Sequence, residues 1–289
     1  MKIDSMNNIQ APSKINYSYH TIKITQSRIE KGLLARPISL KNYFPKTNRK
    51  IMIYLDDSEE PQEKNFTPFS SSTRESRIGG LRNWLIQNNI QSGDEVVIQI
   101  LDQDRYIFRF IPEKKFIAKT SDYQKSFETA DNDDLANLNL FNLAKWTRVE
   151  QSQVYLNEFI RLIRRSRMRE RKVLTKKENR FREKTPNHLR ILLENIYKGN
   201  CQICHFTFLK KYGKPYYEIH HLNPKMGHHP KNLILVCANC HCQFEYSNVK
   251  SVFNQAGRLI EVHFNWKPYQ VNQAITDEKS FDFTKFIHS

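Results

Sequence analysis

Four cysteines in the last third of the chain could bind a metal ion. They form two C-x-x-C pairs, Cys201 with Cys204 and Cys237 with Cys240. Two such pairs are the ligand pattern of a structural zinc site, in which four thiolates surround the ion as a tetrahedron. The spacing therefore predicts a bound Zn²⁺ that stabilises a small module with little apolar core of its own. Cys242 lies outside this pattern.

Histidines and an asparagine beside these pairs are the residue types that phosphodiester hydrolysis needs. His220 and His221 are adjacent, Asn232 follows them, and His241 comes directly after the second pair. An imidazole with a pKa of about 6.5 can take a proton from water near neutral pH. Hydrolysis also needs a cation that neutralises charge on the phosphate and on the leaving oxygen. A regular strand would place His220 and His221 on opposite faces, so we expect the chain to turn there.

The order C-x-x-C, H-H, N, C-x-x-C-H resembles the HNH nucleases of the ββα-metal (His-Me finger) superfamily in their zinc-stapled form. The resemblance covers about residues 186–247. It implies that His221 is the general base and that His220 and His241 hold one divalent ion, Mg²⁺ or Mn²⁺. It also implies that Asn232 holds in place the loop that orients His221.

Two glutamates near this motif are further candidates. Glu245 lies four residues after His241, on the same helical face, and could complete the metal site. Glu218 shares a strand face with His220. The histidines at 228–229 are expected to contact phosphate or solvent rather than a metal ion.

The chain is strongly basic, and the excess charge is local. Its 289 residues include 46 Lys+Arg and 30 Asp+Glu, a net charge of +16 that favours a nucleic-acid partner. Residues 161–200 hold 14 basic and 4 acidic side chains. We expect arginines of this segment to contact DNA phosphates, which supply affinity without sequence preference. The candidates are Arg164, Arg165 and Arg167.

Other function classes lack their sequence signals. Neither G-x-G-x-x-G nor G-x-x-x-x-G-K-[ST] occurs, which disfavours a nucleotide cofactor. The longest apolar runs, such as 233–238, are far shorter than the roughly 20 residues of a membrane span. The N-terminus has no apolar signal-peptide core, so we expect a cytoplasmic protein in a bacterial cell.

Short alternating segments predict a small, mostly β domain in the first part of the chain. The candidate strands cover residues 20–25, 50–55, 96–101 and 106–111, the last two as a hairpin. A short helix is predicted within 80–89. The first part of the chain also resembles the plant-type B-three DNA-binding pseudobarrel, which is also the specificity domain of some bacterial restriction endonucleases. The matching residues are 22–27, Pro37 with 43–45, 51–56, 80–84, 89–97 and 106–110.

This second resemblance implies two arms that enter the major groove of DNA, at about residues 26–36 and 70–77. Arg, Gln and Glu side chains on such arms can read base edges. The candidate base-reading residues are Gln26, Arg28, Lys31, Arg36, Ser72, Thr73, Arg74, Glu75 and Arg77.

The expected fold class is α+β, with an N-terminal β pseudobarrel, a helical basic connector and a C-terminal zinc-stapled ββα-metal nuclease module. The expected boundaries are 1–118, 119–184 and 185–289. Within the connector, we expect a linker with packed turns over 119–150 and helix over 151–184. A further helix is predicted to begin at Thr185-Pro186 and to end at Gly199.

These features predict a site-specific DNA endonuclease of the restriction type. Cutting both strands needs two active sites, so we expect a homodimer on a two-fold-symmetric site. Alternatives within the class are a modification-dependent restriction enzyme and a mobile-element nicking or homing nuclease. The alternative from another class is a non-catalytic, zinc-containing DNA-binding regulator. RNA is disfavoured as a substrate, because the chain lacks the aromatic motifs of RNA-binding modules.

Overall fold

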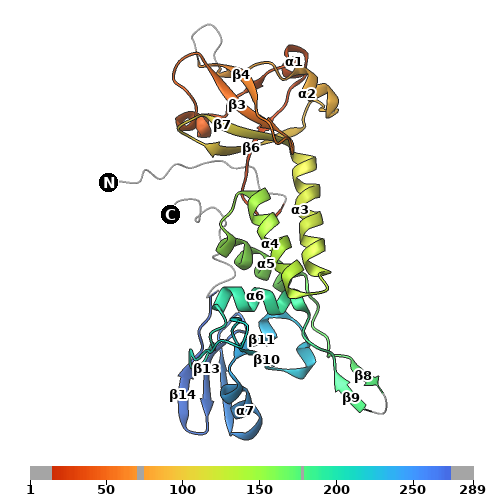
Figure 1. The fold of residues 1–289 in the computed structure, drawn as a ribbon, viewed down its shortest axis with the longest axis vertical. Helices are drawn as coiled ribbons and strands as arrows, with labels where there is room; N and C mark the ends of the chain where they lie inside the picture. Colours follow the sequence, from red (N-terminus) through yellow and green to blue (C-terminus); the bar gives the residue numbers. More distant parts are fainter. Residues whose placement is uncertain (1–14, 70–74, 177–178, 275–289) are drawn as a thin grey trace, which may run out of the picture. The chain divides into compact units, whose positions relative to one another are not determined.

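The computed structural model describes residues 15–69, 75–176 and 179–274, with the backbone alone over 173–182. The chain divides into two compact units between Asp122 and Tyr123. Figure 1 shows the elements of both units along the chain. No helix in the described ranges is long and apolar enough to cross a membrane.

A single seven-stranded sheet forms most of the first unit, and it curls into an open, barrel-like shape (Figure 1). The strand order is β1-β6-β7-β3-β4-β5-β2, and all neighbours are antiparallel except β3 and β7. The strands are β1 His20–Lys23, β2 Leu34–Ala35, β3 Arg49–Leu55, β4 Gln62–Thr67, β5 Arg77–Ile78, β6 Glu95–Asp102 and β7 Ile107–Pro112. The four predicted strands and the β6–β7 hairpin are confirmed.

The core of this unit lies inside the curled sheet. Alternate residues of β3, such as Ile51 and Ile53, are fully buried, as period-two patterning requires. The helices are α1 Gln26–Lys31, α2 Arg82–Gln87 and the 3₁₀-helix η1 Ile38–Tyr43. Helix α2 buries Trp84 in the same core, and the indole Nε1–H donates to Asp56 Oδ2 at 2.9 Å. The predicted short helix is thereby confirmed within 80–89.

Helices replace the predicted linker over 119–150. Helix α3 (Glu113–Glu128) runs across the division between the units, and α4 (Asp133–Thr147) follows in the second unit. The prediction was wrong because the apolar residues are spaced for a helix: Leu140, Leu143 and Ala144 of α4 are buried on one face. Asn132 caps α4, accepting a hydrogen bond from the Leu135 N–H at 2.9 Å.

The helix predicted over 151–184 ends much earlier. Helix α5 (Gln151–Arg165) has a buried apolar stripe, and its last backbone hydrogen bond runs from Ser166 N to Leu162 O. Beyond it, β8 (Val173–Lys176) and β9 (Asn179–Arg182) form an antiparallel hairpin. The prediction failed there because successive Arg and Lys side chains repel at helical spacing and no apolar stripe continues.

Helix α6 (Asn187–Tyr197) packs against α4 and α5, and its apolar residues Leu189, Leu192 and Leu193 are buried. Thr185 was the predicted N-cap and Pro186 the predicted first residue, but Pro186 is the N-cap and the helix starts one residue later, at Asn187. The chain leaves it in the left-handed conformation, with φ 70° at Gly199, and the Gly199 N–H bonds Glu194 O at 3.0 Å. The predicted end of this helix is confirmed.

The remaining chain supplies two small sheets and a helix. Strands β10 (Glu218–His221) and β11 (Leu233–Val236) are antiparallel, and α7 (Ala238–Tyr246) follows β11 directly. Short 3₁₀-helices, η2 Pro224–Met226 and η3 Pro230–Asn232, lie in the connection between these strands. The third sheet has the order β12-β13-β14, with strands Val249–Phe253, Leu259–Phe264 and Lys267–Gln270. A compact core joins β11, α7 and β13 through Val236, Cys240 and Val262.

Candidate metal centre and histidine cluster

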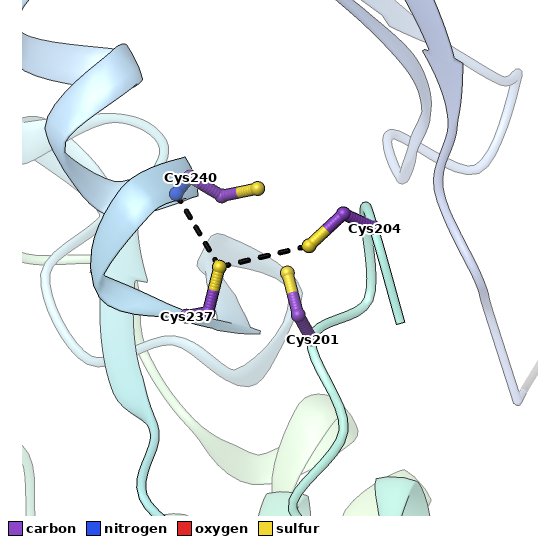
Figure 2. Close-up of side chains that lie close together, drawn as sticks. All are labelled: Cys201, Cys204, Cys237 and Cys240. Atoms are coloured by element: carbon purple, nitrogen blue, oxygen red, sulfur yellow. Dashed lines mark hydrogen bonds between the residues drawn. The ribbon is translucent and has the colours of Figure 1, made fainter. Parts of the chain in front are cut away.

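The four predicted cysteines come together at one point of the second unit (Figure 2). Cys201 and Cys204 lie in the turn after α6, while Cys237 and Cys240 lie at the first turn of α7. Their sulfur atoms all fall within 4.8 Å of one another, the only such group of three or more ligand residues in the described ranges. The Sγ atoms of Cys204 and Cys237 are 3.6 Å apart.

This arrangement fits a structural zinc ion. A tetrahedral Zn²⁺ with Zn–S bonds of about 2.3 Å keeps its sulfurs roughly 3.8 Å apart, close to the observed spacing. A hydrogen bond with the Cys240 thiol lowers the pKa of Cys201 to about 4, and so favours the thiolate that binds metal. Cys242 is exposed and lies outside the group, as predicted.

His220 and His241 meet beside this centre, one from β10 and one from α7. Their ring centroids are 5.3 Å apart, with the rings nearly perpendicular. Phe244, on the next turn of α7, stacks on the His220 ring at 4.0 Å. Burial, together with the nearby charges of His241 and Arg171, lowers the pKa of His220 to about 4. His220 is therefore a neutral imidazole whose lone pair can bind a metal ion.

Glu218 holds the second imidazole in place. Its Oε2 atom lies 2.7 Å from His241 Nδ1, and its Oε1 atom accepts the Tyr216 hydroxyl at 2.6 Å. A carboxylate on Nδ1 fixes the proton on that nitrogen and leaves Nε2 as the metal-binding atom. Glu218 was a candidate because it shares a strand face with His220. Its contact with His241 arises because α7 packs against β10.

Two imidazoles bound to one ion through nitrogens at about 2.1 Å would have centroids roughly 5 Å apart. The observed separation of His220 and His241 matches this value. Glu245 is exposed on α7 and forms no ligand group with these histidines in the described part of the chain. The two rings are thus close enough to share one ion, which would leave further positions of that ion to water or phosphate.

His221 has different neighbours from His220, as expected for adjacent strand residues. Its Nε2 atom lies 3.0 Å from His228 Nδ1. His228 is mostly buried, with 11% of its side chain exposed, and its Nε2 atom is 3.9 Å from Glu183 Oε2. His229 is also buried, with its Nε2 atom 3.1 Å from the Ile163 carbonyl. Neither His228 nor His229 is the solvent-exposed residue that the sequence suggested.

Asn232 is buried immediately before β11, where it holds the loop that follows His221. Its Oδ1 accepts the Asn223 N–H at 2.7 Å. Its Nδ2 donates to the carbonyls of Asn223 and Gly227, both at 2.8 Å. Every hydrogen-bonding atom of the amide is thus committed to the backbone of residues 223–227.

The predicted base-reading residues of the first unit have mixed surroundings. Glu75 pairs with both Arg28 and Arg77, at 3.3 and 3.1 Å, so these three charges partly neutralise one another. Arg36 donates to the Ser76 hydroxyl at 3.1 Å. Gln26 and Lys31 are exposed on α1. Ser72, Thr73 and Arg74 lie outside the described residues.

The predicted phosphate-contacting arginines lie at the end of α5 and just beyond it. Arg164, Arg165 and Arg167 are exposed, and Arg165 also pairs with Glu128 at 3.2 Å. Arg161, one turn earlier, is instead largely buried in an ion-pair network. That difference could not be predicted from the sequence, because it depends on which face of α5 packs against the neighbouring helices α4 and α6.

Comparison with known proteins gives limited information. No family model matches the sequence, and no curated protein matches it. One solved structure similar to this chain is the Arabidopsis FUS3–DNA complex. The two chains are 11% identical with a TM-score of 0.28, and the match covers 32% of this chain and 94% of that chain. At this level of likeness, we base no conclusion about this chain on that protein.

Proposed function

We propose that this chain is a DNA endonuclease that hydrolyses phosphodiester bonds at the His220–His221–His241 cluster. The observation that carries the proposal is the convergence of His220 and His241, with Glu218 fixing the Nδ1 atom of His241. A hairpin of two strands followed by a helix supplies all of these residues. Chemistry at phosphorus needs a base and a cation site close together, and this cluster can provide both.

In this proposal, His220 and His241 hold one Mg²⁺ or Mn²⁺, which would neutralise charge on the phosphate and on the leaving oxygen. His221 acts as the general base and takes a proton from the attacking water. Asn232 fixes the backbone after His221, so the base keeps its place while the phosphate binds. The four-cysteine zinc centre anchors the first turn of α7 and thereby positions His241.

The rest of the chain would bring DNA to this site. The first unit would select the sequence through residues of its two arms, and the exposed arginines at the end of α5 and just beyond it would contact phosphates. The net charge of +16 supports a polyanionic substrate. A separate reader joined to a nuclease suits a restriction enzyme, and we propose that it acts as a homodimer to cut both strands.

Cleavage of plasmid and phage DNA tests this proposal. The zinc-loaded protein is mixed with unmodified and with base-modified DNA, with and without added Mg²⁺ or Mn²⁺. We expect discrete fragments only with added metal, and His221→Ala should abolish them while DNA binding persists. His263→Ala, at a half-buried position on β13 of the same unit, is the matched control and should cut normally.

The substrate that is cut distinguishes ordinary from modification-dependent restriction. Nicked circles without linear product would instead indicate a nicking enzyme. Tight sequence-selective binding with no cleavage in any divalent metal would contradict the nuclease proposal and leave a zinc-containing regulator. Sedimentation of the protein on a short duplex containing the site tests the dimer.

A further inference from the structure

An exposed aromatic hairpin stands between the first cysteine pair and β10. We call residues 206–216 the aromatic hairpin. Its arms are joined by backbone hydrogen bonds from Tyr216 N to Phe208 O and from Lys210 N to Lys214 O. Gly213, with φ 75°, allows the tight turn at its tip. The structure of this segment is therefore fixed by its own backbone and by the zinc centre at its base.

Large apolar side chains of the aromatic hairpin face solvent. Phe206, Phe208, Leu209 and Tyr212 are 52%, 48%, 67% and 86% exposed. The Phe208 ring stacks on Tyr216 with centroids 5.0 Å apart and an interplanar angle of 16°. Exposed apolar side chains gathered on one short segment indicate a binding surface rather than a core.

The charge of the aromatic hairpin indicates the kind of partner. Residues 205–217 contain three lysines and no Asp or Glu. Lys214 pairs with Asp134 at 3.1 Å, whereas Lys210 and Lys211 are exposed and form no ion pair with the described residues. Exposed aromatic rings next to positive charges are typical of surfaces that bind single-stranded nucleic acid. Unpaired bases stack on the rings, and the phosphates contact the lysines.

The aromatic hairpin also connects directly to the histidine cluster. Tyr216, at its end, donates its hydroxyl to Glu218, whose other oxygen holds His241. A strand bound on the rings of Phe208 and Tyr212 would therefore lie beside the proposed cleavage site. This contact links strand binding to the residue that orients His241.

We propose that the aromatic hairpin binds locally unpaired DNA next to the cut, with bases stacked on its exposed rings and phosphates on Lys210 and Lys211. The inference rests on the proposed function, because it assumes that the second unit acts on DNA. It adds a substrate class: DNA whose bases are unstacked or single-stranded beside the scissile phosphate.

Binding of a fluorescent single-stranded 20-mer and of its duplex tests the inference, using full-length zinc-loaded protein without added Mg²⁺. We expect Tyr212→Ala to weaken single-strand binding about tenfold, the usual effect of losing one stacked base. Tyr212→Phe keeps the ring and should bind normally. Trp266→Ala is the matched control, because Trp266 is 94% exposed in the same unit but lies outside the aromatic hairpin.

The lysines have a separate readout. Replacing both Lys210 and Lys211 with Ala should lower the slope of log affinity against log salt by about 1.4 for a single strand, from roughly 0.7 per phosphate contact. Lys145→Ala, exposed on α4, should leave that slope unchanged. Zinc content and circular dichroism of each variant check that the fold is intact.

The inference is overturned if Tyr212→Ala binds single strands as well as Trp266→Ala does. It is also overturned if Tyr212→Ala loses affinity for anionic phosphatidylserine vesicles instead, since that would identify a membrane surface. The readout is binding, so a protein that binds through the aromatic hairpin but never cleaves would contradict only the nuclease proposal.

Discussion

The Asn232 side chain bonds both the N–H and the carbonyl of Asn223, at 2.7 and 2.8 Å. A primary amide matches such a backbone pair because it carries an acceptor and two donors. Its remaining donor bonds Gly227 O at 2.8 Å. The loop after His221 is thus closed by one buried side chain.

Replacing Asn232 with Ala should leave three backbone groups without their partner. Each buried unsatisfied group costs about 1–3 kcal/mol, so we expect the free energy of unfolding to fall by about 3 kcal/mol. Urea denaturation followed by circular dichroism measures it. Asn239→Ala, at an exposed position of α7, should change stability by no more than about 0.5 kcal/mol. A loss for Asn232→Ala as small as the control's would contradict the role given to this residue.

Zinc should bind at the four cysteines and at no other cysteine. Cys237→Ser should remove the bound metal and lower the melting temperature, because binding energy at a structural zinc site is folding energy. Cys242 is also on α7 but is exposed and lies outside the group, so Cys242→Ser should retain the bound zinc and the wild-type melting temperature. Metal analysis of each purified protein, with thermal melts, checks this expectation. Full zinc content in Cys237→Ser would refute the assignment.

Part of the acid sensitivity of the fold should come from His188 on α6. Burial lowers its pKa below the usual value of about 6.5, with the nearby Arg161 adding to that shift and Glu128 opposing it. Its ring packs edge-on against Phe127, with centroids 5.8 Å apart. The folded state therefore favours the neutral ring, so its contribution is present above pH 6.5 and is lost as pH falls toward the folded-state pKa.

His188→Gln should lose less stability than the wild type between pH 7.5 and pH 5.5. Urea midpoints at several pH values measure the difference. Lys145→Gln, at an exposed position of α4, is the control and should follow the wild type. An identical pH dependence in His188→Gln would show that the burial of this ring does not affect stability.

The ion-pair network on α5 should be far more important for stability than its exposed neighbour. Arg161 lies 2.6 Å from Glu158 and 2.7 Å from Glu128, and the Glu158 side chain is fully buried. Arg161→Leu would remove the cation that faces the buried Glu158 carboxylate, and breaking a buried ion pair in this way costs about 3–5 kcal/mol. Arg165→Ala removes a 65% exposed side chain and should cost less than about 1 kcal/mol. Chemical denaturation of both variants compares them, and equal losses would be inconsistent with this account.

The sequence was most informative where structure depends on neighbours along the chain. The strands of the first unit were predicted because alternation of apolar residues within five or six positions determines which face is buried. Each cysteine pair was predicted for a similar reason, since C-x-x-C spacing already holds the two sulfur atoms of one pair close together. The early end of α5 and the helix over 133–147 were missed, although their charge and apolar spacing were visible.

The pairings that could perform chemistry were decided by the tertiary structure. Glu218 and His241 are far apart in sequence, and only the docking of α7 against β10 puts them in hydrogen-bond contact. The same holds for Arg161 with Glu128, which lie on different helices. The sequence by itself determined which residue types were present and which local elements they favour. Only the packed fold decided which of them meet, because long-range contacts depend on the burial of all elements together.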